Sequence, residues 1–342
     1  MRRTDAGNRG VTPPSSLTCR DDWSRMPVLS PEKWTLRTQF ERLLMRTRRC
    51  EFYSDGIRLE GLLQLPESVS SDGTLAIIVL CSGFQGLKEL IPAKLWAPLT
   101  DAGFACFAFD YRGFGTSKGE RGRVQPAEQV EDIRNAVTCL QQQPEVSRER
   151  IGLIGWGFGG GVAVQAAAED ARVCAVACLN GVGDAGRAVR DSRTHADWLA
   201  IQDRIAGDRV RRVLTGQSQK VSPWDVVPLD PVTRARVDED MYGRFDAFGV
   251  EVTLQSAEAY YAFRPELAAG RISPRPILII HGVRNALHQI DEARSLYACA
   301  REPKDLIEIP EGHHLDWIEP GHPLYVTTIP RIVNWFRQHL YP

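Results

Sequence analysis

A short glycine-rich segment in the middle of the chain limits the fold more than any other feature of the sequence. Residues 155–160 read Gly-Trp-Gly-Phe-Gly-Gly, follow the apolar run at 151–154 and precede the alanine-rich stretch at 161–168. This order predicts a buried strand that passes through a tight glycine turn directly into a helix. A strand–turn–helix unit of this kind is typical of proteins in which strands and helices alternate.

The same alternation continues on both sides of this turn. Asp55-Gly56 lies between apolar segments and predicts a hairpin of strands at 50–53 and 57–65. Helix-like stretches separate further strands, so we expect an α/β fold with a mostly parallel, twisted sheet covered by helices on both faces. The further strands are predicted at 75–80, 104–109, 151–154, 173–179, 276–280 and 305–309. Helices outside the middle region are predicted at 31–46, 87–102, from 126 onward, after the glycine turn, and at 291–300 and 330–340.

The alternation stops between residues 182 and 272. Charged, helix-like segments such as 197–214 and 230–244 fill this stretch, which is too long for a loop. We therefore expect an inserted helical cap, and we expect the polar N-terminus to form a flexible tail. The predicted parts are a tail at 1–29, the core at 30–181, the helical cap at 182–272 and the second part of the core at 273–342.

Composition argues against several classes of function. The 342 residues carry a net charge of −1, so electrostatics give no reason to expect a nucleic-acid or membrane partner. The eight cysteines include no Cys-x-x-Cys pair, so no metal site is expected. No apolar segment is long enough to span a membrane, and the cysteine usage fits a reducing cytoplasm. We expect a small-molecule substrate, no cofactor and no metal, and we leave a homodimer open.

The glycine turn also allows a different interpretation. Gly155, Gly157 and Gly160 match the dinucleotide-binding pattern G-x-G-x-x-G, which occurs in the same strand–turn–helix context. That pattern normally opens the first βαβ unit of a domain, whereas this turn follows two earlier strand–helix pairs. The next strand ends in Asn-Gly at 180–181, and the nearest acid that could bind a ribose is Asp184. Dinucleotide binding is therefore the less favoured alternative.

Several loops are expected to meet at the carboxyl edge of the sheet, where ligands bind in such folds. Two of these loops are rich in glycine, so the backbone N–H groups of Phe84 and Phe158 are candidates for an oxyanion hole. The loops are residues 81–86, the turn at Gly157, residues 281–285 and residues 311–316. Candidate pocket residues, chosen by position alone, are Ser82, Gln85, Trp156, His281, His288 and Glu89.

A catalytic triad would need a nucleophile at the turn, an acid in the third loop and a histidine in the fourth. The turn carries Gly157, which has no nucleophilic atom, and the third loop carries the neutral amide Asn285. The fourth loop holds two neighbouring histidines, His313 and His314, and Asp184 is an alternative acid. The scaffold for acyl chemistry is therefore predicted without its usual nucleophile.

Three longer motifs agree in order and spacing with one known family. They are Gly-Phe-Gln-Gly-Leu-Lys-Glu at 83–89, Phe-Asp-Tyr-Arg-Gly-Phe-Gly-Thr-Ser at 109–117 and Gly-His-His-Leu-Asp at 312–316. From about Cys50 to the C-terminus, apart from much of the cap, the chain resembles the dienelactone-hydrolase-like branch of the α/β-hydrolase superfamily. The resemblance implies an α/β-hydrolase fold with an inserted cap.

The resemblance also implies roles for individual residues. It places the catalytic histidine of the family on His314, the position of its serine on Gly157 and the position of its usual acid on Asn285. Where the family has a histidine before the glycine of the first motif, this chain has Ser82. Asp110 and Arg112 of the second motif are expected to hold loops rather than to do chemistry.

Three hypotheses of function remain open beside dinucleotide binding. The first is an enzyme without a covalent intermediate, in which His314 is a general base or acid and the backbone hole stabilises an enolate or oxyanion. Elimination, cyclisation, C–C cleavage and water-mediated hydrolysis all fit this scheme, and the cap indicates a bulky, natural-product-like substrate. The second is a catalytically inactive binding protein. The third is an ester or thioester hydrolase inactivated by a natural or engineered serine-to-glycine replacement.

Overall fold

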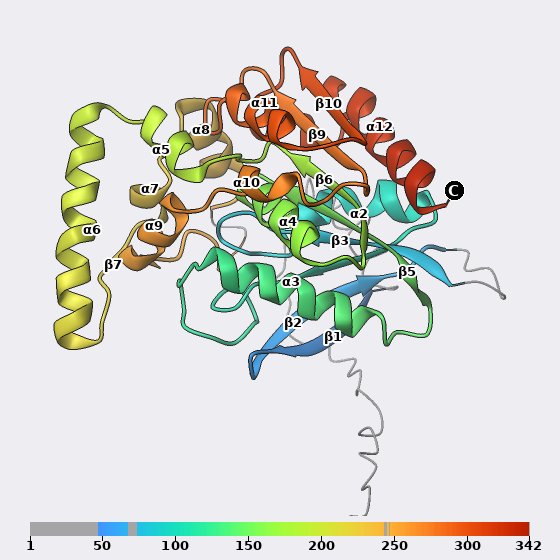
Figure 1. Ribbon diagram of the computed structural model, residues 1–342, viewed down its shortest axis with the longest axis horizontal. Coiled ribbons are helices and arrows are strands. Elements are labelled where there is room, and N and C mark those ends of the chain that lie inside the picture. The colour runs from blue at the N-terminus through green and yellow to red at the C-terminus, as the bar shows by residue number, and fades with distance from the viewer. Residues whose placement is uncertain (1–46, 68–73, 243–244, 246, 342) are drawn as a thin grey trace, which may run out of the picture.

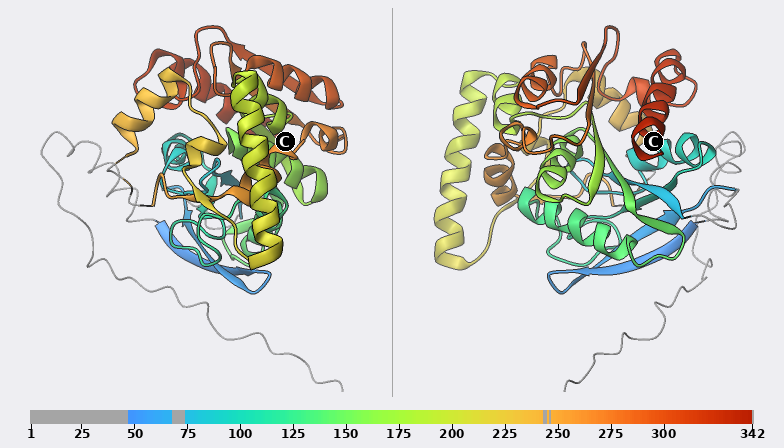
Figure 2. Two further views of the ribbon diagram at one scale, coloured as in Figure 1. Left: turned by 90° about the vertical axis from the view of Figure 1, so that its left-hand side faces the viewer. Right: turned by 45° about the vertical axis from the view of Figure 1, so that its right-hand side comes forward.

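The computed structural model describes residues 47–67, 74–242, 245 and 247–341 (Figure 1). The predicted tail at 1–29 and the predicted helix at 31–46 lie outside the described residues. In the described part, a twisted sheet occupies the centre and helices lie on both of its faces (Figures 1 and 2).

The sheet has eight strands in the order β1-β2-β4-β3-β5-β6-β9-β10. β2 pairs antiparallel with β1 and β4, and all other neighbours are parallel, which confirms the predicted mostly parallel sheet. The predicted hairpin is also confirmed, because Asp55 and Gly56, with φ of 49° and 77°, connect β1 to β2. The strands are β1 (Thr47–Ser54), β2 (Ile57–Gln64), β3 (Leu75–Cys81), β4 (Ala105–Phe109), β5 (Val146–Trp156), β6 (Val173–Leu179), β9 (Ile277–Gly282) and β10 (Lys304–Ile309).

The central strands of the sheet are buried on both faces, which explains why β3, β4 and β9 read as nearly continuous apolar runs. In β3, Ile77 and Val79 belong to one core cluster, whereas Ile78 and Leu80 belong to the other. The first face is covered by α3 (Pro126–Leu140), α4 (Phe158–Glu169) and α11 (Ile290–Cys299) (Figure 1). The second face is covered by α2 (Ile91–Asp101) and α12 (Pro323–Leu340).

Two helices begin several residues away from their predicted starts. α2 starts at Ile91 rather than at 87, because the segment before it forms turns. α12 starts at Pro323 rather than at Pro330. Proline suits the first helical position, since it has no N–H to satisfy, and the His322 side chain accepts the N–H of Leu324 at 3.2 Å. Pro330 therefore lies inside a longer helix.

The residues between β6 and β9 form the part predicted as a helical cap. A two-stranded ladder of β7 (Lys220–Val221) and β8 (Val252–Thr253) lies among its helices and departs from the prediction. Strands of two residues are too short to produce a recognisable alternation of apolar and polar residues in the sequence. The longest helix of the described residues, α6, stands apart from the sheet in Figure 1 and in the right view of Figure 2. The helices are α5 (Ala185–Asp191), α6 (His195–Thr215), α7 (Pro223–Val226), α8 (Pro231–Asp240), α9 (Leu254–Tyr261) and α10 (Glu266–Ala269).

Candidate active site

The glycine-rich turn is a sharp corner between β5 and α4. β5 ends at Trp156, α4 begins at Phe158, and Gly157 between them has φ 58° and ψ −130°. Residues with a Cβ rarely adopt this conformation, and strained corners of this kind expose the residue that they carry. The Gly157 N–H donates to the Leu179 carbonyl at 2.9 Å, which fixes the corner against the end of β6.

Close packing accounts for the glycines on both sides of the corner. A Cβ on Gly155 would lie 2.1 Å from the Gly159 carbonyl oxygen, and a Cβ on Gly159 would lie 2.1 Å from the Ser82 carbonyl oxygen. Gly157 differs, because the nearest atom that a Cβ would meet there is His314 Nε2 at 3.3 Å. A side chain at position 157 would therefore enter the space beside His314.

The loop after β3 lies against this corner. The rings of Phe84 and Phe158 are in edge contact, with centroids 6.2 Å apart. The backbone N–H groups of the same two residues have no hydrogen-bond partner among the described residues. The Phe158 N–H is at the start of α4, where the helix dipole also favours negative charge. Two such N–H groups are suited to bind a developing oxyanion.

His314 lies in the loop between β10 and the 3-10 helix η2 (Asp316–Ile318). The Asp316 carboxylate accepts the N–H of His313 at 3.0 Å, which explains the aspartate of this motif. Trp156 packs against the His314 ring, with ring centroids 6.1 Å apart. His314 is 6% exposed, and burial lowers its pKa well below the usual value, so the imidazole is neutral at neutral pH.

Asn180, directly after β6, connects the segments that contain His314, Gly282 and His288 through hydrogen bonds. Its Nδ2 donates to the His314 carbonyl at 2.8 Å, and its Oδ1 accepts the N–H of Gly282 at 2.8 Å. Its own carbonyl lies 2.9 Å from Nδ1 of His288. The residue has φ 49°, a conformation that asparagine tolerates better than most residues. Sequence reasoning missed this role, although Asn-Gly directly after a buried strand was an available signal.

The structure does not bring the predicted acid position to His314. Asn285 Oδ1 accepts the N–H groups of Leu287 and His288 at 3.2 and 3.1 Å, and Nδ2 lies 3.2 Å from Nε2 of His281. In the part of the chain that the structure describes, His314 Nδ1 has no hydrogen-bond partner. Asn285 therefore hydrogen-bonds within its own loop, and no hydrogen bond joins it to His314.

Two further histidines, His281 and His288, are buried near His314. His281 and His288 are 0% and 3% exposed, and burial lowers the pKa of each to about 4. The His288 and His314 rings meet edge to face, with centroids 5.1 Å apart. The His288 Cε1 atom lies 3.7 Å from the place of a Cβ on Gly157. Two neutral imidazoles therefore border the space at position 157.

A cavity opens in front of these two imidazoles, between the carboxyl edge of the sheet and the cap. It has a volume of about 110 Å³ for the centres of water-sized molecules. Most of its lining is apolar, and a cavity with few polar groups is typical of small-molecule sites. Sequence reasoning did not identify the cap residues that line it, which include Trp224, Val237, Met241, Phe248 and Tyr260.

The predicted pocket residues divide into two groups. Gln85 and Trp156 line the cavity. Ser82 does not, because α4 packs directly on its backbone and leaves it 2% exposed. His281 does not line the cavity either, since it is fully buried within β9. Glu89 is exposed and lies outside the lining.

Three charged residues named in the sequence analysis make structural hydrogen bonds. Asp110 accepts the N–H of Lys88 at 2.9 Å and so fixes the loop after β3. Arg112 donates to the buried Asp132 at 2.6 Å. These contacts confirm the expectation that both residues support loops. Asp184 caps the start of α5, where it accepts a backbone N–H at 2.9 Å, so it does not serve as the acid of a triad.

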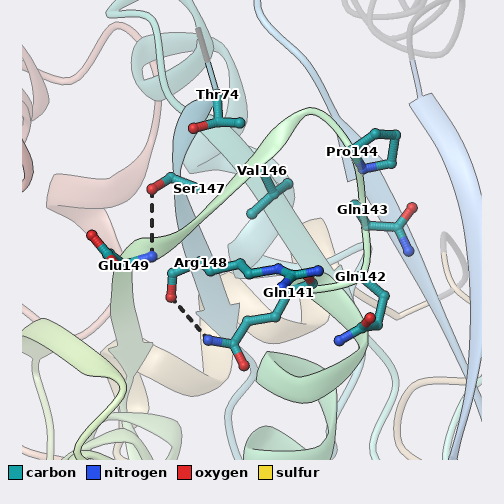
Figure 3. Close-up of a pocket in the computed structure, with 9 residues that line it drawn as sticks. All are labelled: Thr74, Gln141, Gln142, Gln143, Pro144, Val146, Ser147, Arg148 and Glu149. Atoms are coloured by element: carbon teal, nitrogen blue, oxygen red, sulfur yellow. Dashed lines mark hydrogen bonds between the residues drawn. The ribbon is translucent and has the colours of Figure 1, made fainter.

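A larger hollow, with a volume of about 560 Å³, lies between the end of α3 and the start of β5 (Figure 3). Its lining, which is Thr74, Gln141–Pro144 and Val146–Glu149, contains no histidine or cysteine, and it is at the amino end of the strands. The candidate active site is therefore the cavity beside His314. Within the described ranges, no cluster of three histidine, cysteine or acidic side chains could hold a metal ion. None of the helices in the described residues is long and apolar enough to cross a membrane.

Comparisons with known proteins identify the family and the fold. A family model described as "Serine aminopeptidase, S33" matches residues 73–321. The crystal structure of hypothetical protein PA2218 from Pseudomonas aeruginosa has a TM-score of 0.75 and is 28% identical, and the match covers 87% of this chain and 95% of that one.

Two relatives carry names that describe an activity. Thiohydrolase apmlB from Arthrinium phaeospermum is 28% identical, over 78% of this chain and 89% of the relative. Polyketide transferase grgF from Penicillium sp is 26% identical, over 77% of this chain and 87% of the relative. The TM-score to the crystal structure of GrgF is 0.72, with 20% identity over 86% of this chain and 99% of that one.

Proposed function

The chain belongs to the α/β-hydrolase superfamily, in the family described as serine aminopeptidase S33, and we propose that it is an enzyme that works without a covalent intermediate. Gly157 then stands where the family carries its serine, and His314 assists the proton transfer. The substrate is a bulky apolar small molecule with a reactive carbonyl, bound between the sheet and the cap. The names of the two relatives, a thiohydrolase and a polyketide transferase, favour an acyl thioester of natural-product type.

One observation carries this proposal. A Cβ on Gly157 would lie 3.3 Å from His314 Nε2, and Phe84 and Phe158, whose backbone N–H groups have no partner among the described residues, line the same cavity. An imidazole and two candidate oxyanion donors are therefore contributed by residues around one cavity. An oxyanion donor contributes about 10²–10³ in rate and a positioned acid or base about 10²–10⁴, so useful catalysis does not require the serine.

For a thioester the reaction is water-mediated hydrolysis. Water beside Gly157 attacks the carbonyl carbon and gives up a proton to the imidazoles, while the carbonyl oxygen becomes an oxyanion that accepts the N–H groups of Phe84 and Phe158. The carbon–sulfur bond then breaks, the carbonyl re-forms, and the departing thiolate takes up the proton that the imidazoles received. In elimination, cyclisation or C–C cleavage, the same groups act on a substrate atom instead of water.

Thioester turnover tests this function. Acyl-N-acetylcysteamine thioesters of increasing chain length are the probes, and the released thiol is measured with a chromogenic disulfide. We expect His314→Gln to lower kcat at least about 10²-fold. His313→Gln is the matched control, because His313 precedes His314 and does not line the cavity. Equal activity of the two variants would remove His314 from the chemistry.

A second function, ligand binding without turnover, is favoured by one observation. Among the described residues nothing bonds His314 Nδ1, so no acid stabilises an imidazolium there. Saturable binding of the same acyl chains with no thiol release at any pH between 5 and 9 would support this alternative.

A further inference from the structure

We propose that His288 is a second catalytic residue, whose Nε2 atom binds a hydroxyl group, of water or of the substrate, in the space beside Gly157. The hydroxyl donates to His288 and accepts from His314. The catalytic consequence rests on the function proposed above, whereas the binding site stands on its own geometry.

The surroundings of His288 fix which of its nitrogens carries the proton. Nδ1 lies 2.9 Å from the Asn180 carbonyl oxygen, and because a carbonyl only accepts, Nδ1 must donate. The ring is neutral at neutral pH, since burial lowers its pKa to about 4, so Nε2 holds a lone pair. Nε2 is buried and has no hydrogen-bond partner in the described part of the chain. A buried acceptor without a partner is unfavourable and indicates a place for a ligand.

His314 offers the complementary group. Its Nδ1 is also buried without a partner among the described residues, and an orphaned N–H is rarer in proteins than an orphaned acceptor. The proton therefore belongs on Nε2, which is the ring atom nearest to the side-chain space of Gly157, at 3.3 Å. One donor and one acceptor, on rings whose centroids are 5.1 Å apart, thus face the same space. A hydroxyl group matches both.

This arrangement gives the two residues different tasks, proton transfer for His288 and hydrogen-bond donation for His314. As the hydroxyl oxygen bonds to the carbonyl carbon, its proton passes to His288 Nε2, and the oxyanion formed in the same step stabilises the new imidazolium. As the carbon–sulfur bond breaks, the thiolate takes this proton from the His288 imidazolium, which returns His288 to its neutral form. His314 keeps its own proton on Nε2 throughout and holds the reacting oxygen by a hydrogen bond. The Asn180 carbonyl fixes the tautomer of His288 by accepting from Nδ1, and the acid of a catalytic triad fixes the tautomer of its histidine in the same way.

Nitrogen NMR tests the binding site independently of activity. In protein labelled with [¹⁵N]histidine, two-bond ¹H–¹⁵N spectra distinguish the tautomers, and the variants His288→Asn and His314→Gln assign the signals. We expect the proton of His288 on Nδ1 and that of His314 on Nε2. A proton on Nε2 of His288 would overturn the proposal whatever the kinetics show.

Kinetics then test the role of His288. His288→Asn is the informative variant, because its amide N–H can still donate to the Asn180 carbonyl while Nε2 is lost. We expect kcat for thioester hydrolysis to fall about 10²–10³-fold with KM unchanged and the thermal midpoint retained. Wild-type kcat in this variant would overturn the catalytic role.

The product shows which hydroxyl group is bound. A free acid identifies it as water, whereas a lactone from an ω-hydroxyacyl thioester identifies it as a hydroxyl of the substrate. Either product supports the site. If the wild-type protein turns over no thioester, the proposed function fails, and the NMR result alone decides on the site.

Discussion

Replacing Gly157 with serine probes the site most sharply. With φ 58° and ψ −130°, the backbone conformation costs a residue with a Cβ about 1–3 kcal/mol. Space is not limiting, because the nearest atoms to the new Cβ are Nε2 and Cε1 of His314 at 3.3 and 3.4 Å. We therefore expect Gly157→Ser to fold and to lose about 1–3 kcal/mol in its free energy of unfolding.

The new hydroxyl would lie beside His314 without forming a competent triad. His314 Nδ1 has no partner in the described chain, and Asn285 bonds its own loop. Loss of the orienting acid in a serine protease lowers kcat by about 10⁴. We expect acylation of Gly157→Ser by p-nitrophenyl acetate to be about 10⁴-fold slower than in a complete triad. The native thioester hydrolysis should also disappear, because the side chain fills the space of the nucleophile.

Stopped-flow release of nitrophenolate and the mass of the intact protein measure this outcome. Gly207→Ser is the matched control, because Gly207 lies on α6 and a Cβ there would meet nothing within 4 Å. It should behave as the wild-type protein. A stoichiometric burst with acylated Gly157→Ser would refute the reasoning and identify an esterase that lacks only its serine.

Three further predictions concern the frame of the site. Gly155→Ala should lower the free energy of unfolding by at least about 3 kcal/mol, because its Cβ would lie 2.1 Å from a backbone oxygen; an unchanged urea midpoint would contradict this. Asn180→Ala removes three side-chain hydrogen bonds and should cost about 1–3 kcal/mol and reduce thioester turnover; full turnover would show that His314 is held by other contacts. His281 and His288 have pKa values of about 4 when folded and about 6.5 when unfolded, so the unfolded state binds more protons between these values. The free energy of unfolding should rise with pH across this window, by up to about 1.4 kcal/mol per pH unit for each histidine, and level off above it; a flat urea series from pH 4 to 8 would exclude this.

The sheet could be predicted from the sequence because its central strands are buried on both faces. β3 reads as an uninterrupted apolar run for this reason, and Gly155 and Gly159 mark a corner at which backbones touch. The ladder of β7 and β8 could not be predicted, since a pair of two-residue strands leaves no periodic pattern. The start of α12 was missed because Pro323 and Pro330 are equally suited to open a helix by residue type, and only the His322 cap distinguishes them.

The site was only partly predictable for a related reason. Motif spacing placed Gly157 and His314 at one edge of the sheet, and the structure puts them 3.3 Å apart, measured from the Cβ position of Gly157 to His314 Nε2. Asn285 and His288 share one loop, and no periodicity tells which of the two side chains turns toward the cavity. The backbone N–H groups of Leu287 and His288 hold Asn285 within the loop, so His288 faces the space instead. A hydrogen bond of this kind forms only in the folded loop, and no sequence pattern predicts it.

The absence of a covalent intermediate is open to direct measurement. Rapid quenching of a single turnover with excess protein over a thioester, followed by intact-protein mass spectrometry, records every acylated form. We predict that thiol and product accumulate while the protein keeps its unmodified mass at all times. Appearance and decay of an acylated protein at the rate of turnover would contradict chemistry at Gly157 without a nucleophilic side chain.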